Sequence, residues 1–127
     1  IIGASSLAPL PAFPDGLRGR GLIVPGPDST VRHAFEQLCD YHRLAPNIIA
    51  EVDDMAMMRL LARDTCHLAV MPPVVVRDEL RAGTLTDFGA LPGAFEEFYA
   101  ITIRRRFESP LLKRLLGQSS EALLPAR

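Results

Sequence analysis

The sequence predicts an α/β domain, Rossmann-like in kind, with a mostly parallel sheet flanked by helices. Short apolar runs alternate with longer segments whose apolar residues recur at helical spacing, which is the pattern of strands alternating with amphipathic helices. Strands joined through helices run parallel, because a right-handed crossover returns the chain to the same end of the sheet. Turns rich in Pro, Gly, Asp and Ser separate these segments.

The first part of the chain supplies two strands, a loop and a helix. "IIGAS" predicts a short strand, and "LAPLPAFPDGLRGRG" predicts a loop because it is rich in Pro and Gly. A buried strand is expected over residues 21–26, ended by Pro25. A helix follows, and Asp28, Ser29 and Thr30 are all suitable N-caps for it. Its apolar face is expected to contain Val31, Ala34, Phe35, Leu38 and His42.

The middle of the chain continues the alternation. Residues 46–52 predict a strand, because they are rich in β-branched side chains. "DDMAMMRLLAR" predicts a helix opened by Asp53 or Asp54, since a carboxylate suits the positive start of a helix. The methionines Met55, Met57 and Met58 are interpreted as core residues, with an adaptable contact surface as the alternative.

The last part predicts two helices and three strands. "HLAVM" is a third buried strand, and the next helix begins at Pro72 and ends at Gly83, since proline suits a first turn and glycine a C-terminal stop. "TLTDFGAL" predicts a short strand, and "EFYAITIRR" predicts an apolar one after a Pro-Gly turn. A final helix begins at Ser109, with its leucines on one side.

Composition and charge indicate one ordinary globular domain. The chain has 127 residues, 48% apolar and 23% charged, with a net charge of −1. A net charge of this size does not indicate a nucleic-acid-binding surface. The arginine run 104–106 is interpreted as a solvated strand end. No run approaches the roughly 18 apolar residues that span a bilayer, and no signal peptide is recognisable. We expect a cytoplasmic protein in which Cys39 and Cys66 are free, buried thiols.

Ligands of parallel α/β sheets bind outside the carboxyl ends of the strands, which here are residues 25–30, 50–54 and 70–73. None of these segments carries a catalytic pattern: "PGPDST" lacks the lysine of a phosphate loop, and no Gly-x-Ser-x-Gly elbow occurs. Asp53 and Asp54 are interpreted as helix caps rather than a general base or metal ligands.

A metal site is also not expected. The candidate ligands are Cys39, His42, Cys66 and His67. Cys66 and His67 are neighbours entering a strand and point to opposite sides, so the four side chains do not reach one tetrahedral centre. We therefore expect no metal, no cofactor and no enzymatic activity.

Several motifs follow one another in a recognisable order. They are a Ser/Thr-led helix with an arginine over residues 29–32, "PNIIAEVDD", a leucine-bearing helix, a strand ending in Pro, and "VRDELRAGTL". Over about residues 16–116 this order resembles the second half of the effector-binding domain of LysR-type transcriptional regulators. The segments "PGPDSTVR" and "EFYAIT" are most similar to those of the subgroup that includes the sodium/proton antiporter activator.

The resemblance implies a subdomain of the periplasmic-binding-protein type 2 fold that senses a small-molecule effector without catalysis. The residues implied for the effector are Pro25, Gly26, Asp28, Ser29, Thr30, Glu51, Asp53, Asp54, Met71 and Pro72. Backbone N–H groups and two hydroxyls would suit an anionic effector, whereas Asp53 and Asp54 would suit a cation or amine; the sequence leaves this open. A homodimer or larger homo-oligomer is implied, with DNA contacted only through a helix-turn-helix domain that precedes these residues, and no membrane contact.

The resemblance also implies a division of the chain. Residues 1–15 would be the crossover strand and linker from a first subdomain, 16–104 the second effector-binding subdomain, and 105–127 the C-terminal helix and tail. The start at Ile1 rather than Met agrees with a fragment that holds one wall of the effector cleft. Asp64 stands before the third strand, where the family usually has glycine, so either Asp64 adopts the glycine conformation or the turn differs.

Two other classes remain as alternatives. A solute-binding protein of the periplasmic type shares this fold, and a small α/β enzyme would use "PGPDST" to hold phosphate. A helix-turn-helix encoded upstream would favour the regulator, and a signal peptide would favour the solute-binding protein.

Overall fold

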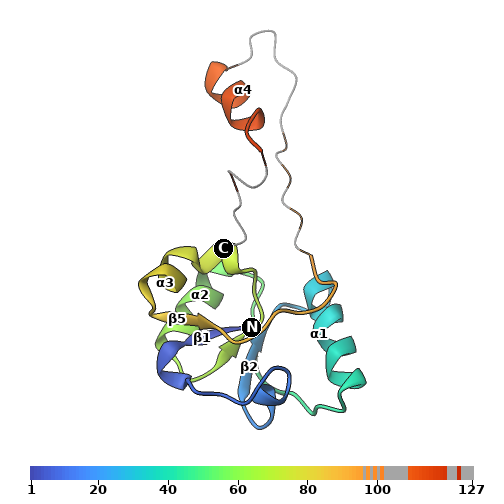
Figure 1. Cartoon of the computed structure of the whole chain (residues 1–127). Coiled ribbons are helices and arrows are strands. Elements are labelled where there is room, and N and C mark those ends of the chain that lie inside the picture. Colours follow the sequence, from blue (N-terminus) through green and yellow to red (C-terminus); the bar gives the residue numbers. More distant parts are fainter. Residues whose placement is uncertain (96, 98, 100, 102–108, 120–122, 124–127) are drawn as a thin grey trace. The chain divides into compact units, whose positions relative to one another are not determined.

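The computed structural model describes residues 1–95, 97, 99, 101, 109–119 and 123. The chain divides into two compact units, Ile1–Glu96 and Glu97–Arg127. The first unit contains a five-stranded sheet with helices, and the second contains helix α4 (Pro110–Leu116) (Figure 1). The α/β fold class predicted from the sequence is confirmed.

The sheet is mostly parallel. Its strands are β1 (Ile2–Ala4), β2 (Gly21–Val24), β3 (Asn47–Glu51), β4 (Leu68–Ala69) and β5 (Leu85–Asp87), in the order β3-β2-β4-β1-β5. β2 lies between β3 and β4 and pairs in parallel with both. β1 is antiparallel to β4 and to β5. Within this sheet β1 therefore runs against the other four strands.

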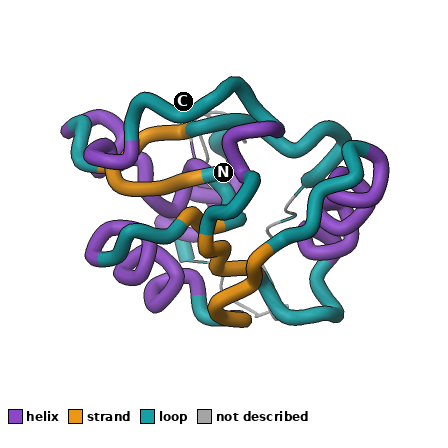
Figure 2. Tube along the Cα trace, turned by 90° about the horizontal axis from the view of Figure 1, so that it is seen from below, coloured by secondary structure: helices purple, strands orange, loops and turns teal. Residues whose placement is uncertain are grey.

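Helices cover both faces of the sheet. α1 (Thr30–Tyr41) lies on one side, and α2 (Met55–Asp64) and α3 (Arg77–Ala82) lie on the other (Figure 1). Figure 2 shows the same layers from below, with the strands between the two groups of helices. Three short 3₁₀ turns connect the elements: η1 (Ser5–Leu7), η2 (Asp15–Leu17) and η3 (Pro73–Val76).

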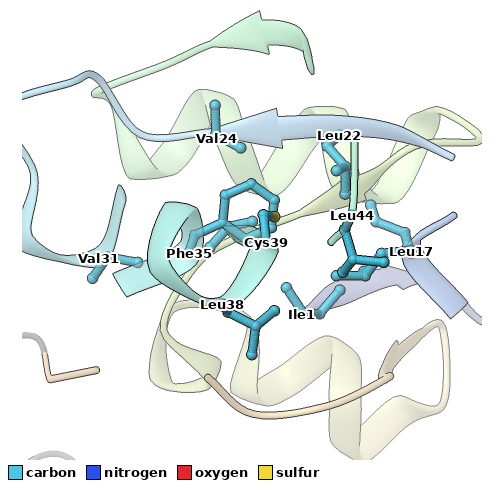
Figure 3. Close-up of a cluster of buried hydrophobic side chains, with 11 residues drawn as sticks. Ile1, Leu17, Leu22, Val24, Val31, Phe35, Leu38, Cys39 and Leu44 are labelled. Atoms are coloured by element: carbon cyan, nitrogen blue, oxygen red, sulfur yellow. The ribbon is translucent and has the colours of Figure 1, made fainter. Parts of the chain in front are cut away.

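Two cores result from the alternation of side chains along the central strands, since successive residues of a strand point to opposite faces. Leu22 and Val24 pack on Phe35 of α1, and all three are buried (Figure 3). Ile23 lies between them in the sequence and packs in the other core with Met58 of α2. The apolar faces of the helices therefore cover both faces of the sheet.

The helix caps follow the sequence closely. Ser29 is the N-cap of α1, and its Oγ accepts N–H bonds from the second and third helical residues at 3.2 and 3.4 Å. Asp54 caps α2, with Oδ1 accepting the Met57 N–H at 2.7 Å. Gly83 ends α3 with φ at 72°, a left-handed value that favours glycine. These three predicted positions are confirmed. The predicted helix start at Pro72 was wrong, because Pro73–Val76 form the 3₁₀ turn η3 and α3 begins at Arg77.

Two expectations about burial on the helices were wrong. Met57 is 49% exposed rather than part of the core, whereas Met58 is fully buried as expected. α2 contacts the sheet with one face only, so Met58 and Ala62, four residues apart, point inward and Met57 does not. His42 is exposed because α1 ends at Tyr41, one residue earlier than its predicted apolar face required.

The connection between α2 and β4 also differs from expectation. Cys66 is exposed, because it lies in this connection before the chain enters the sheet, whereas Cys39 is buried as predicted. Asp64 remains in the last turn of α2, and Thr65 leaves the helix in extended conformation with φ at −123° and ψ at 171°. Asp64 therefore does not replace a left-handed glycine; the turn itself is different.

In the C-terminal unit, the structure describes the helix α4. This helix begins after Ser109 as predicted, with Pro110 in its first turn. Three of its leucines are exposed, Leu111, Leu115 and Leu116. The predicted strand over residues 97–105 and the arginine run 104–106 lie largely or wholly outside the described residues. Among the helices that are described, none is long and apolar enough to cross a membrane.

Candidate functional site

The carboxyl ends of β2, β3 and β4 lie side by side, because β2 pairs in parallel with both neighbours. Backbone hydrogen bonds continue just beyond the strands: Val52 N donates to Val24 O, and Val70 N donates to Ile23 O, each at 2.9 Å. Residues 25–30, 50–54 and 70–73 therefore share one edge of the sheet. We call this edge the strand-end face.

The ten residues predicted from the sequence all belong to the strand-end face, but they differ in exposure. Pro25, Gly26 and Met71 are buried; Ser29 and Pro72 are half-buried; Asp28, Thr30, Glu51, Asp53 and Asp54 are exposed. Met71 packs into the core beneath α2, so its side chain supports the face from below. The polar members are the ones that a ligand would reach.

Asp53 joins two of the three turns. The Gly26 N–H donates to Asp53 Oδ1 at 2.9 Å, across 27 residues of sequence. A Cβ atom on residue 26 would lie 2.5 Å from that oxygen, so glycine is needed for the approach. Asp54 has a different role as the cap of α2. Of the two adjacent carboxylates that were predicted as caps, one caps its helix and the other holds the neighbouring turn.

Arg32 is a residue of this region that sequence reasoning left out of the candidate site. Its guanidinium is buried in α1, with Nη1 donating to Pro25 O at 3.1 Å and to Glu51 Oε1 at 2.9 Å. Nε donates to Glu36 Oε1 at 2.7 Å. The available signal was an arginine on the apolar face of a helix, one turn before a glutamate. Its pairing with Glu51, at the end of β3, had no corresponding sequence pattern.

The electrostatics of the strand-end face are acidic. Its three segments contain the carboxylates of Asp28, Glu51, Asp53 and Asp54 and no lysine or arginine. Burial acts to lower the pKa of Arg32, but its hydrogen bonds to Glu51 and Glu36 outweigh this, and the pKa is raised overall. Arg32 therefore stays charged, and two carboxylates already accept its hydrogen bonds.

The candidate metal ligands named from the sequence do not come together. Cys39 lies on the buried face of α1, and Cys66 is exposed between α2 and β4. In the part of the chain that the structure describes, no three His, Cys, Asp or Glu side chains form a group that could hold a metal ion.

A mostly parallel sheet with helices on both faces, whose strand ends meet at a polar edge, defines an α/β subdomain of the kind that binds ligands at its strand ends. Comparison with known families is more specific. The family described as the LysR substrate binding domain matches residues 4–123, and the chain belongs to this family. The family has the periplasmic-binding-protein type 2 fold. The resemblance identified from the order of motifs is confirmed.

Two curated relatives are similar to this chain. They are the transcriptional activator protein NhaR of Escherichia coli (strain K12) and the protein of the same name from Shigella flexneri. Each is 26% identical over 111 residues, which are 87% of this chain and 37% of the relative. The chain thus spans little more than a third of the length of these relatives. No solved structure matches the chain at a significant level.

Proposed function

We propose that this chain is the effector-sensing domain of a LysR-type transcription regulator and that a small molecule binds at its strand-end face. Membership of the LysR substrate-binding family supports the first part. The observation that carries the second is the meeting of three turns at one edge of the sheet, which is where ligands of parallel α/β sheets bind. Exposed polar groups from two of these turns would contact the effector.

On this proposal the domain conveys a signal and makes or breaks no covalent bond. An effector that binds one arrangement of the regulator better than another shifts the population toward it, and differential affinity is sufficient for this. The roles of the described side chains support this view. Ser29 and Asp54 cap helices, and Asp53 and Arg32 tie neighbouring turns together.

For the whole protein we propose a homodimer or larger homo-oligomer that acts in the cytoplasm and contacts DNA through a separate helix-turn-helix domain. Both relatives are named as transcriptional activators, which supports contact with DNA, and their greater length supports a separate domain for it. Residues 1–15 would then be the crossover from a first subdomain, 16–104 the second subdomain, and 105–127 the closing helix and tail. The strand-end face would form one wall of the effector cleft.

A thermal-shift screen against small organic acids, amines and metal ions tests the proposal. A ligand that binds only the folded state raises the melting temperature. The exposed Thr30 hydroxyl can be removed with Thr30→Ala without loss of the Ser29 cap, and Ser29→Ala/Thr30→Ala removes both hydroxyls. We expect a hit whose stabilisation falls in Thr30→Ala and is lost in the double variant.

Ser6→Ala is the matched control, because Ser6 is an exposed hydroxyl in η1. η1 follows β1, which runs against β4, so it lies at the opposite edge of the sheet. Stabilisation by the hit should be unchanged in Ser6→Ala. A hit that is weakened by Ser6→Ala and unaffected by the double variant would contradict the proposed location.

A further inference from the structure

The turn between β2 and α1 is built like an anion site. Its backbone N–H groups lie at the start of a twelve-residue helix, where the helix dipole is positive. In this chain a carboxylate of the chain itself occupies the turn. Asp53 Oδ1 accepts the Gly26 N–H at 2.9 Å, and a Cβ atom on Gly26 would lie 2.5 and 3.0 Å from the two oxygens of that carboxylate.

Several other donors around this turn are also engaged. Ser29 Oγ accepts the N–H groups of Val31 and Arg32. The Arg32 guanidinium, whose Nη1 reaches the turn at Pro25 O, is shared between Glu51 and Glu36. An incoming anion would therefore have to displace an existing acceptor from each of these donors. It would also approach a face whose three segments carry four carboxylates and no lysine or arginine.

We propose that Asp53 is a specificity-determining residue of the strand-end face, because it takes the position of a bound anion and so selects against anionic effectors. The Gly26 N–H already donates to Asp53 and is not available to an incoming anion, and the negative charge of Asp53 repels that anion. A neutral or positively charged ligand that donates a hydrogen bond meets a carboxylate that can accept it. This decides between the two effector classes that the sequence left open. The inference rests on the proposed function, which places an effector at this face, and it deepens that proposal by naming the class of effector.

Inorganic phosphate is the probe. The ¹⁵N-labelled chain is titrated with phosphate at constant ionic strength, and the Gly26 amide signal is followed in wild type, Asp53→Ala and Asp28→Ala. Asp28→Ala is the matched control, because Asp28 is an exposed carboxylate of the same turn for which the structure gives no bond to Gly26. Both variants lose one negative charge, and only Asp53→Ala frees the Gly26 N–H.

The expected result is a saturable shift of the Gly26 amide in Asp53→Ala, with phosphate affinity at least about tenfold above wild type and above Asp28→Ala. If Asp53→Ala does not give a folded spectrum, Asp53→Asn keeps an acceptor for Gly26 while removing the charge. It should bind phosphate more tightly than wild type. Equal phosphate affinity in wild type and the Asp53 variant, or equal gains in the Asp53 and Asp28 variants, would overturn the inference.

The titration uses no effector, so its failure is separate from failure of the proposed function. If phosphate binds wild type at Gly26, Asp53 does not exclude anions, and the strand-end face can still hold an effector. If the thermal-shift hit maps to the opposite edge of the sheet, the proposed function fails whatever phosphate does.

Discussion

Arg32 Nη1 donates a hydrogen bond to Glu51 Oε1 at 2.9 Å, joining α1 to the end of β3 across 19 residues of sequence. The arginine side chain is 8% exposed and that of Glu51 is 50% exposed, so a buried charge is paired with one that still reaches water. The same nitrogen holds Pro25 O at the end of β2. Two strand ends and one helix start are thereby fixed relative to one another.

Replacing this arginine should be costly. Arg32→Met keeps the buried alkyl stem and removes the hydrogen bonds to Pro25, Glu51 and Glu36, which we expect to lower the free energy of unfolding by about 1–3 kcal/mol. Urea denaturation measures this. Arg63→Met is the control, because Arg63 pairs with Asp64 at the surface and should change stability by less than about 0.5 kcal/mol. Equal losses in the two variants would contradict the role given to Arg32.

A methyl group on residue 26 should disrupt the contact with Asp53. We expect Gly26→Ala to destabilise the chain by about 1–3 kcal/mol, because the Asp53 carboxylate must move and give up the residue 26 N–H. The three atoms nearest to the added Cβ all belong to the Asp53 carboxylate, so in the Asp53→Ala background the cost of Gly26→Ala should fall by about 1 kcal/mol or more. Additive effects in this double-mutant cycle would show that the contact is not formed.

The two cysteines should react at very different rates. Cys66 is exposed and should be modified quickly by a disulfide reagent under native conditions. Burial, and then the nearby charges of Asp40 and Glu36, raise the pKa of the Cys39 thiol, so little thiolate is present. Cys39 should therefore be modified only as the chain opens. Cys66→Ser should abolish the fast phase; a fast phase that persists would contradict the burial of Cys39.

The raised pKa of Cys39 also predicts a dependence of stability on pH. As pH rises, the thiol ionises first in the unfolded chain, so its contribution is complete below the unfolded pKa, about 8.5, and is lost as pH rises through the folded pKa. The stability difference between wild type and Cys39→Ala should be constant near neutral pH and should shrink in alkaline solution. Unfolding in urea at several pH values measures it, with Cys66→Ser as a control. A difference independent of pH would contradict the shift.

Most of the fold could be predicted because it is determined locally. The apolar spacing of α1, the caps at Ser29 and Asp54 and the left-handed stop at Gly83 each depend on residues within one or two turns. Met57 was assigned wrongly to the core because periodicity does not show which part of an apolar helix meets the sheet. That is decided by packing between elements.

The candidate site was predictable as a region, and its internal contacts were not. Parallel strand order places the ends of β2, β3 and β4 together, which the alternation of elements already indicated. The bonds of Asp53 to Gly26 and of Arg32 to Glu51 cross from one strand end to the next, over 27 and 19 residues. They depend on strand register, which leaves no pattern in the spacing of these four residues. The sequence therefore indicated N–H groups open to an anion where the fold supplies its own carboxylate.

The most direct test of the account is to map where an effector binds. The chain, ¹⁵N-labelled, is titrated with the compound found in the thermal-shift screen, and amide chemical-shift changes are measured along the described residues. The account predicts that the largest changes fall in residues 25–30, 50–54 and 70–73, including the amides of Gly26 and Asp53. Largest changes in Ser5–Leu7 and residues 65–67, at the opposite edge of the sheet, would contradict it.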